Sequence, residues 1–540
     1  MREVILDSFR ILKGLLLCGF VACFALPSVA QQGPTQAELD AAAGQGINWL
    51  HATHDYTGQR FVDLSEITTK NVRGLHSVAI FQTSEYGPAQ TNPFVYNGVM
   101  YITTTHTTVA LDAATGRKRW ENVWKAKDKE TFITNRGAAI KDGLVVRGTA
   151  DGYLIALDAA TGVLKWERKI ASPKDGEFLS APPLITGDRI IIGPAGAEWA
   201  AKGWVGAFNL SNGTPLWKFN TVPDPGEPGA ETWGKDPAVL THGGGNVWTP
   251  LSFDRAKGLV YVAIGNPAPA LYDDLRPGDN LYTCSMIALD VNTGKLRWHF
   301  QAVPHDTHDW DLTQVSPLFT TKVRGVQREL IAVAGKDGLL RVLDRDSHTL
   351  LYSVPFTRRE NVDVPVTADP VHVFPGGLGG EEWSGPAYNH ITDMLYVPSV
   401  ENGCTYVKAK EAPVPDGKDL YLGGTFTMDP WEQSRGSLTA FDASTGKQRW
   451  TYRSAAPMLA GVCTTSGGLV FTGEHGQDFL ALDARTGEVL YRFNTGGPVA
   501  GGVVSYSVNG KQYVAAISGY VSPFFAPIGG GTTTVIIFAL

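Results

Sequence analysis

The sequence predicts an all-β protein, an eight-bladed β-propeller whose repeated tryptophans dock between neighbouring blades. Three observations support this fold class: a short segment that recurs along the chain, a high content of turn-forming residues, and a last strand without the second half of the repeat. The 540 residues include 61 Gly and 32 Pro, which indicates many turns rather than long helices. Hydrophobic residues make up 43%, enough for a large buried core. A net charge of −7 without a basic excess argues against a nucleic-acid partner.

The recurring segment first occurs at Ala110–Trp120, which reads ALDAATGRKRW. Most copies start 41 to 54 residues apart, near the period of propeller blades, but two intervals are longer, at 81 and 98 residues. We expect insertions or a degenerate blade in those two intervals. The further copies start at Ala156, Ala207, Ala288, Val342, Ala440 and Ala481.

Each copy predicts a β-hairpin. In the first copy, apolar residues lead a strand to Asp112, a turn ends at Gly116, and the aromatic residue lies on the next strand. A single hairpin cannot bury both of its faces, so we expect the copies to stack radially and to close a ring. The repeated tryptophans are interpreted as packing between neighbouring blades. They are Trp120, Trp166, Trp217, Trp298 and Trp450.

The final segment, Thr532–Leu540, ends like the first half of a repeat. We expect it to pair with a strand near the N-terminus, around residues 56–58, and so to close the ring. Seven full copies and this divided one give the eight blades of the predicted fold.

Residues 1–30 resemble a secretory signal peptide, with an apolar stretch at 11–26 and small residues before a cleavage point near Ala30. An uncleaved membrane anchor is the alternative interpretation. Residues 31–540 are expected to form a single propeller domain in the periplasm, with no integral membrane span after cleavage. This part holds three cysteines, too few for a disulfide-dense scaffold, and it has no C-x-x-C-H motif for a c-type haem.

Four segments outside the repeat are candidates for function, because propeller sites lie where loops converge at the central channel. In them, Glu198, Asn266 and Asp309 offer hard oxygen donors from separate blades, the kind that a Ca²⁺-like cation gathers. On composition alone, solvated loops are the favoured interpretation, and a metal site is the alternative. The absence of a nearby cysteine and of a histidine pair at i, i+4 disfavours zinc. The four segments are 193–204, 243–249, 265–269 and 304–311.

The repeat A-x-D-x-x-T-G-x-x-x-W, followed along the chain by GAEW, GGGNVW, GNPAP and PHDTHDWD, resembles the quinoprotein alcohol dehydrogenases of the methanol/ethanol dehydrogenase family. The resemblance covers about residues 45–540. It implies an eight-bladed propeller that holds pyrroloquinoline quinone (PQQ) and one metal ion in its central channel. It also implies oxidation of an alcohol, with the electrons passing to an external acceptor such as a cytochrome c or a membrane quinone.

The same resemblance implies roles for the acidic residues. Glu198, Asn266 and Asp309 correspond to metal ligands, and Asp309 also to the catalytic base. Asp311 lies where lanthanide-using members have an additional carboxylate, so a lanthanide is favoured over Ca²⁺ because more negative charge suits a trivalent ion. A hydrogen bond that the Asp311 carboxylate accepts from the loop backbone is the alternative.

Further residues are implied to bind the cofactor. Trp248 resembles the floor on which the planar quinone stacks, and Lys336 the cation that contacts its reactive oxygens and stabilises developing negative charge. The residues implied to hold the carboxylates and the edge of PQQ are Arg136, Ser180, Gly196 and Ala197.

The chain also departs from the family pattern. Many members carry two adjacent cysteines before the Asn-Arg-Gly motif; here that region has none, and Phe132 is the candidate for covering the quinone. A quinone-contacting Asn matches Asn402 only with a shifted register. A tryptophan common over the substrate pocket is replaced near Leu459, which predicts a wider pocket and an alcohol bulkier than methanol.

Two other functions remain open at this point. A quinoprotein of the same fold acting on a sugar, polyol or aldehyde would need the same motifs. A non-catalytic propeller scaffold of the cell envelope would keep the repeats and the tryptophan packing, but it would not need Glu198, Trp248, Asn266, Asp309 and Lys336 to converge.

Overall fold

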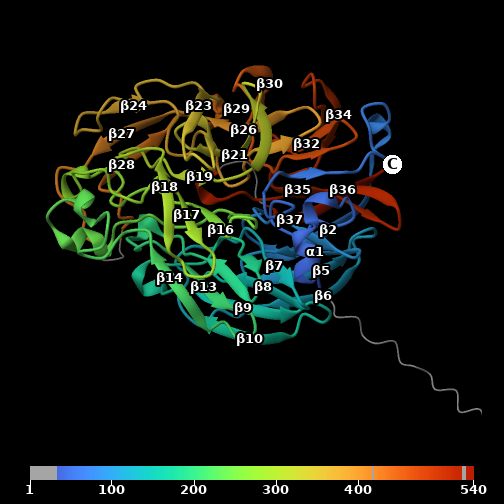
Figure 1. The fold of residues 1–540 in the computed structure, drawn as a ribbon, viewed down its shortest axis with the longest axis horizontal. Helices are drawn as coiled ribbons and strands as arrows, with labels where there is room; N and C mark the ends of the chain where they lie inside the picture. The colour runs from blue at the N-terminus through green and yellow to red at the C-terminus, as the bar shows by residue number, and fades with distance from the viewer. Residues whose placement is uncertain (1–32, 416–418, 526–530) are drawn as a thin grey trace, which may run out of the picture.

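The computed structural model describes residues 33–415, 419–525 and 531–540, and the predicted signal peptide lies outside them. Their strands form antiparallel sheets that follow one another around a ring in chain order (Figure 1). The all-β prediction is confirmed. In these described residues the one α-helix is α1 (Gln36–Asp40), and none of the helices has the length and hydrophobicity needed to cross a membrane.

Most sheets are built from four consecutive strands. The first four are β3 (Phe94–Tyr96), β4 (Val99–Thr103), β5 (Thr107–Asp112) and β6 (Lys118–Val123); β7 (Ala139–Lys141), β8 (Leu144–Gly148), β9 (Tyr153–Asp158) and β10 (Leu164–Lys169); β11 (Leu184–Thr186), β12 (Arg189–Ile192), β13 (Trp204–Asn209) and β14 (Pro215–Asn220); and β15 (Ser252–Asp254), β16 (Leu259–Ala263), β17 (Ser285–Asp290) and β18 (Leu296–Gln301). The next are β19 (Leu312–Gln314), β21 (Val326–Gly335), β22 (Leu339–Asp344) and β23 (Leu350–Pro355), with β20 (Leu318–Val323) paired to β21; β25 (Ala387–Asn389), β26 (Met394–Glu401), β29 (Arg435–Asp442) and β30 (Gln448–Ser454); and β31 (Cys463–Thr465), β32 (Leu469–Gly473), β33 (Asp478–Asp483) and β34 (Val489–Asn494).

The repeated segment forms the predicted hairpin. In its first copy Ala110 of β5 pairs with Trp120 of β6. Asp112 Oδ1 accepts hydrogen bonds from the backbone N (3.0 Å) and the hydroxyl (2.9 Å) of Thr115. Gly116 follows with φ +66°, a conformation that glycine adopts without strain.

The repeated tryptophans pack against the next sheet along the chain, as predicted. Trp120 donates from Nε1 to the carbonyl of Ala159 at 2.9 Å, and its ring lies against Gly162, where a Cβ would come within 2.5 Å of the indole. Trp298 differs because the next copy has His348 in place of this glycine. Its ring stacks on that imidazole at 4.3 Å.

The ring closes through β37 (Thr532–Ala539), but the predicted partner was wrong. This strand pairs with β2 (His76–Tyr86), in a sheet completed by β35 (Val499–Val508) and β36 (Lys511–Ser518). Residues 56–58 form a turn in which Asp55 Oδ1 accepts from the backbone N of Thr57 (2.6 Å) and of Gly58 (3.0 Å), so this segment does not extend as a strand.

The N-terminal segment also reaches another sheet. Downstream of that turn, β1 (Phe61–Val62) adds in parallel to β31. One apolar cluster includes residues of both chain ends, among them Trp49, Phe94, Phe471 and Phe538. Closure of the ring therefore rests on core packing as well as on strand pairing.

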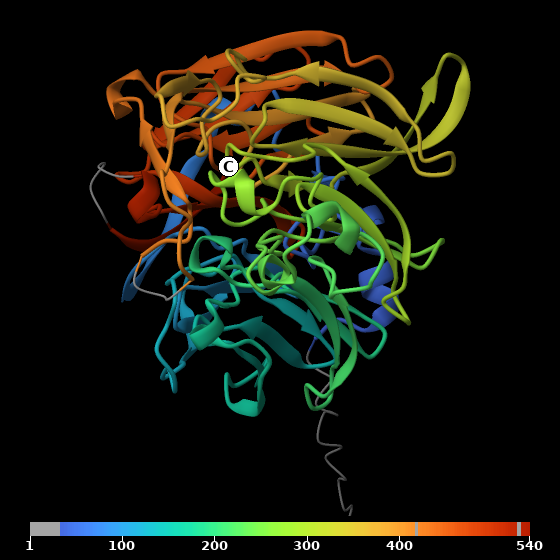
Figure 2. The ribbon, with the colours of Figure 1, turned by 90° about the vertical axis from the view of Figure 1, so that its left-hand side faces the viewer.

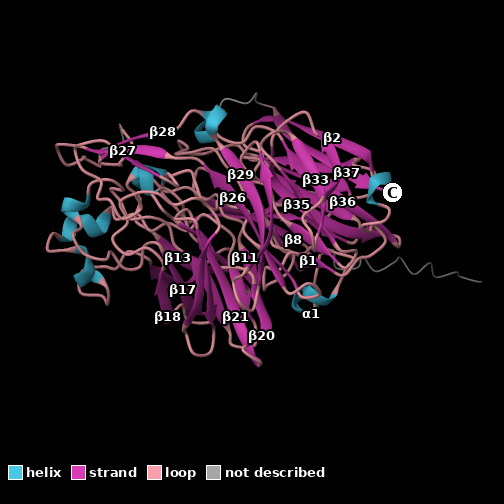
Figure 3. Cartoon of the chain, turned by 90° about the horizontal axis from the view of Figure 1, so that it is seen from above, coloured by secondary structure: helices cyan, strands magenta, loops and turns pink. Residues whose placement is uncertain are grey.

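The two long intervals between repeats hold insertions, as expected. Residues 223–245 carry two 3₁₀ helices, and residues 371–428 carry a sheet of β24 (Val371–Val373), β27 (Cys404–Lys408) and β28 (Gly424–Met428). In the view of Figure 2, loops and short helices lie in front of the sheets. Figure 3 shows several short helices beside β27 and β28. The 3₁₀ helices are η1 (Ala42–Gly44), η2 (Val72–Gly74), η3 (Pro173–Asp175), η4 (Ala197–Trp199), η5 (Ala230–Trp233), η6 (Pro237–Thr241), η7 (Asp273–Leu275), η8 (Trp431–Gln433) and η9 (Pro523–Phe525).

Candidate active site

Loops from many of the sheets line a pocket of about 870 Å³ that opens to solvent. The pocket collects nearly all of the residues that the sequence singled out. Ser180 is the exception: it is buried behind the wall, where its Oγ accepts a hydrogen bond from Arg136 Nη1 at 2.9 Å. The predicted residues that line the pocket are Arg136, Gly196, Ala197, Glu198, Trp248, Asn266, Asp309, Asp311 and Lys336.

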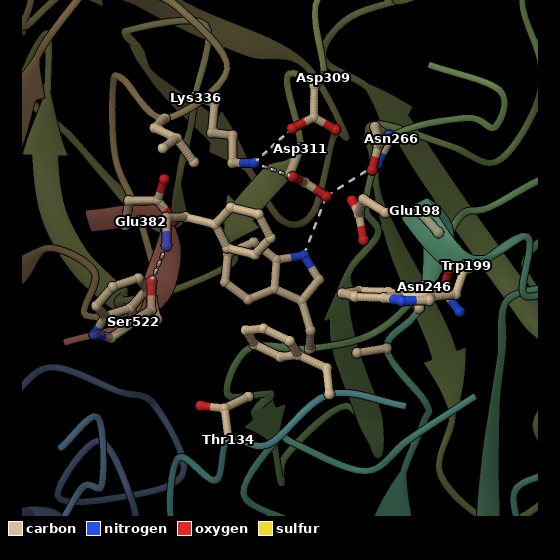
Figure 4. Close-up of a pocket in the computed structure, with 18 of the residues that line it drawn as sticks. Thr134, Glu198, Trp199, Asn246, Asn266, Asp309, Asp311, Lys336, Glu382 and Ser522 are labelled. Atoms are coloured by element: carbon tan, nitrogen blue, oxygen red, sulfur yellow. Dashed lines mark hydrogen bonds and ion pairs between the residues drawn. The ribbon is translucent and has the colours of Figure 1, made fainter. Parts of the chain in front are cut away.

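The oxygen-bearing side chains come from three separate loops and face one another (Figure 4). Glu198 lies on η4, Asn266 follows β16, and Asp309 and Asp311 precede β19. Asn266 Oδ1 and Asp309 Oδ1 are buried and have no hydrogen-bond partner among the described residues. Buried oxygens without partners are costly, and oxygen donors of this kind suit a hard cation, so the residues present fit a metal ion.

The loop around Asp309 is held by its own backbone contacts. Asp306 accepts hydrogen bonds from the backbone N of His308 and of Trp310, both at 3.1 Å, and so fixes the residues on either side of Asp309. Asp309 has φ +63°, which a non-glycine residue rarely adopts. The turn therefore directs the Asp309 carboxylate into the pocket.

Asp311 is fixed more tightly than its neighbour. Its Oδ1 accepts from the backbone N of Asn266 (3.0 Å) and from Trp248 Nε1 (3.1 Å). A Cβ at Gly265 would lie 2.4 Å from the same oxygen, so the glycine leaves room for this carboxylate. Asp311 thus makes the backbone hydrogen bond that the sequence left as an alternative, while its Oδ2 still faces Lys336.

A single lysine lies between the two aspartates. Lys336 Nζ is 3.2 Å from Asp309 Oδ2 and 2.6 Å from Asp311 Oδ2, and all three side chains are buried. Burial alone would lower the pKa of Lys336, but the two carboxylates raise it well above its usual range. The residues described form no cluster of three or more acidic, histidine or cysteine side chains that is already arranged around a metal position.

The acidic groups are strongly perturbed. Burial, with the charge of Asp311 as the next cause, raises the pKa of Glu198. Burial also raises the pKa of Asp309 well above its usual range, although Lys336 opposes the shift. Three carboxyl groups around one ammonium leave an excess of negative charge that a metal ion would neutralise.

The pocket wall also contains a cation between aromatic rings. Arg136 Cζ lies 4.7 Å from the ring centroid of Trp248 and 5.4 Å from that of Trp383. Burial lowers the pKa of Arg136 to about 10, so the side chain stays charged at neutral pH. A flat indole with fixed cations nearby suits a planar anion.

The mouth of the pocket is aromatic. The ring of Phe132 packs against Phe178, Trp199 and Phe524, with centroids 5.8, 5.4 and 5.6 Å away. Phe132 therefore lies beside the partly exposed Phe524, at the end of the pocket that we call its mouth, and its covering of the quinone stays a prediction. Leu420 also lines the pocket and is 41% exposed.

One expectation about the wall was wrong. Leu459 is buried beside Trp383 and Phe525 and does not line the pocket, so a smaller residue there does not widen it. Asn402, which matches the quinone-contacting position only with a shifted register, also lies outside the lining residues. Its side-chain amide donates to Ser434 Oγ, just before β29.

Sequence reasoning missed several lining residues. Glu382 and Trp383 follow Gly379-Gly380 in a long interval between repeats, the same signal that pointed to the four candidate segments. Asn246 was within a candidate segment but was given no role. Phe524 and Phe525 gave no signal, because only the fold brings the C-terminal segment to this pocket.

The chain matches known proteins over nearly its whole length. The family model "Glucose/ethanol/alcohol dehydrogenase, beta-propeller domain" matches residues 49–365, and the model "Outer membrane protein assembly factor BamB" matches residues 405–521. Quinoprotein alcohol dehydrogenase PedH of Pseudomonas putida is 32% identical over 572 residues, which cover 96% of this chain and 92% of that protein.

Solved structures agree with this match. Quinohemoprotein alcohol dehydrogenase ADHIIG of Pseudomonas putida superposes with a TM-score of 0.88 at 27% identity, covering 93% of this chain and 82% of that one. A europium-containing methanol dehydrogenase gives 0.85 at 26% identity, covering 93% and 100%. The chain belongs to the PQQ-dependent alcohol dehydrogenases, a family of β-propeller oxidoreductases that act on CH–OH donors.

Proposed function

We propose that this protein is a periplasmic dehydrogenase that oxidises a primary or secondary alcohol bulkier than methanol to the aldehyde or ketone. Its electrons pass to an external acceptor, a cytochrome c or a quinone. The observation that carries the proposal is the buried group of Glu198, Asn266 and Asp309, with two unpartnered oxygens, beside Lys336 and Trp248.

The cofactors would be held by residues of the pocket. Glu198, Asn266, Asp309 and Asp311 would bind one metal ion, and the additional carboxylate of Asp311 favours a lanthanide over Ca²⁺. PQQ would lie on Trp248. Bound there, it would supply the two-electron acceptor for hydride from the alcohol carbon. The residues that would bind it are Arg136, held by Ser180, together with Gly196, Ala197 and Lys336.

Two side chains would handle charge during the reaction. Asp309 would take the hydroxyl proton of the alcohol on its carboxylate, one oxygen of which, Oδ1, has no partner in the structure. Lys336 contacts the other oxygen of Asp309, so it holds the base in place and offers a fixed positive charge where negative charge develops. Metal binding would bring the raised pKa of Asp309 down and leave the base ionised.

The aromatic mouth supports the choice of substrate. Phe132, Trp199 and Phe524 give an apolar entrance above a charged interior. An alcohol with an alkyl or aromatic body would bury that body at the mouth while its hydroxyl reaches Asp309. Methanol would leave these apolar surfaces without a partner.

The proposal extends to the organisation of the chain. Residues 1–30 would be a signal peptide, and residues 31–540 one propeller domain of eight blades. The regular succession of four-stranded sheets around the ring supports this count.

A dye-linked dehydrogenase assay tests the proposal. Purified protein is reconstituted with PQQ and either Ca²⁺ or La³⁺, and is offered short, long and aromatic alcohols, a sugar, a polyol and an aldehyde. We expect activity only with both cofactors, highest with a bulky alcohol, and a fall of at least about a hundredfold in Asp309→Ala. Preference for a sugar, polyol or aldehyde would contradict the substrate assignment. Inactivity with both Ca²⁺ and La³⁺ would contradict the enzyme function.

A further inference from the structure

One acidic side chain of the pocket has no role in the proposed reaction. Glu382 lies in the loop before β25, lines the pocket and is 6% exposed. Figure 4 shows it on the side of Lys336, away from Glu198 and Asn266. It therefore stands apart from Glu198 and Asn266, two of the residues that would hold the metal.

The Glu382 carboxyl group is incompletely satisfied. Its Oε1 is buried and has no hydrogen-bond partner among the described residues. The adjacent Glu381 is the opposite case, since it accepts from Thr313 Oγ1 (2.7 Å) and from the backbone N of Gly385 (2.6 Å). The two neighbouring glutamates thus differ: Glu381 is held by hydrogen bonds within the fold, whereas Glu382 faces the pocket with one oxygen that accepts no hydrogen bond.

The charges around Glu382 act in both directions. Burial is the largest influence and raises the pKa of Glu382 to about 7. The positive charges of Lys336 and Arg136 lower this pKa, and the negative charge of Asp311 raises it. PQQ carries carboxylates of its own. An anion that enters beside Glu382 disfavours its ionised form further, and a protonated carboxyl group becomes a hydrogen-bond donor.

We propose that Glu382 is an additional cofactor-binding residue, which holds a proton while the pocket is filled and donates a hydrogen bond to the bound cofactor. This inference rests on the proposed function. It makes cofactor binding depend on pH in a defined direction. Because the protonated form is the donor, binding is strongest below the pKa of Glu382 and weakens as the pH rises through it.

The test measures binding rather than turnover. Quenching of tryptophan fluorescence by PQQ, with Ca²⁺ at saturation, gives the Kd at pH 6 and at pH 8. We expect the wild-type protein to bind about tenfold more weakly at pH 8, as a donor with a pKa near 7 requires. Glu382→Gln presents a neutral amide donor at every pH, so we expect similar Kd values at both pH values, close to that of the wild type at pH 6.

Matched variants separate the proton from general disruption. Glu381→Gln makes the same chemical change one residue away, outside the pocket, and should keep the pH dependence of the wild type. Glu382→Leu has no donor and should bind weakly at both pH values, with thermal unfolding used to verify that it is folded.

The outcomes distinguish this inference from the proposed function. If the wild type binds PQQ equally well at both pH values, or if Glu382→Gln keeps the wild-type pH dependence, the role of Glu382 is overturned while the proposed function stands. If the wild type binds no PQQ with Ca²⁺ or with La³⁺, the proposed function itself fails and this inference fails with it.

Discussion

The turn of the first hairpin repeat and the pocket loops differ in how far their polar side chains are hydrogen-bonded. In the first repeat, Asp112 accepts from Thr115 through one oxygen and from Arg119 Nη2, at 2.9 Å, through the other. In the pocket, Asn266 Oδ1, Asp309 Oδ1 and Glu382 Oε1 are buried without partners. The turn of the first repeat is satisfied by its own sequence, whereas the pocket keeps unsatisfied oxygens at a cost in stability. That contrast marks the pocket as the part of the molecule built for a ligand.

Removal of a repeat tryptophan should cause the largest loss of stability while leaving the chemistry of the pocket unchanged. Trp120→Ala removes a buried indole and its hydrogen bond to Ala159, which have no role in the pocket. We therefore expect a loss of about 3–5 kcal/mol of unfolding free energy. Chemical denaturation measures this loss. At temperatures where the variant is folded, its metal preference should equal that of the wild type.

Trp298→Ala is the matched comparison. Among the described residues, Trp298 Nε1 has no hydrogen-bond partner, so its removal should cost about 1 kcal/mol less than that of Trp120. Equal losses for the two variants, or an altered metal preference in Trp120→Ala, would contradict the separation between the repeats and the pocket.

Removal of the pocket lysine should have the reverse effect, a loss of catalytic rate rather than of stability. Lys336→Ala takes away the cation between Asp309 and Asp311, and we expect kcat to fall by about 10²–10³-fold. Steady-state kinetics with PQQ and metal at saturation measures this fall.

Lys336→Arg is the control, because it keeps the charge while changing its shape. It should lose less activity than the alanine variant. A Lys336→Ala enzyme with wild-type kcat would show that the lysine only balances the charges of the two aspartates.

How far the sequence foretold the structure follows the same division. The hairpins were predictable because Asp112, Thr115 and Gly116 determine the turn within a few residues, and Trp120 recurs at a fixed distance from it. The partner of the closing strand was not, because β2 (His76–Tyr86) carries no copy of the repeat. Strand pairing between the two chain ends depends on the closed ring, which no local pattern encodes.

The site divides in a similar way. Motifs within single loops led to Glu198, Asn266 and Asp309, and the structure brings them together. Leu459 was misplaced because it lies in a loop between β30 and β31, and no local pattern tells whether such a loop residue packs in the core or lines the pocket. Glu382 was missed although its glycine-flanked segment resembled the others.

The mouth of the pocket is where the comparison predicts the smallest effect. Phe132 lies where the loops meet solvent, packed on Phe178, Trp199 and Phe524, so its removal should alter recognition rather than folding or chemistry. We expect Phe132→Ala to lower kcat/KM for an aromatic or long-chain alcohol about tenfold, with a smaller change for ethanol, since only the larger substrates bury surface against this ring. The neighbouring Ile133 is 43% exposed and does not line the pocket, so Ile133→Ala should leave both values unchanged. A Phe132→Ala enzyme that loses the same factor with ethanol as with the bulky alcohols would show that the ring protects the cofactor instead of selecting the substrate.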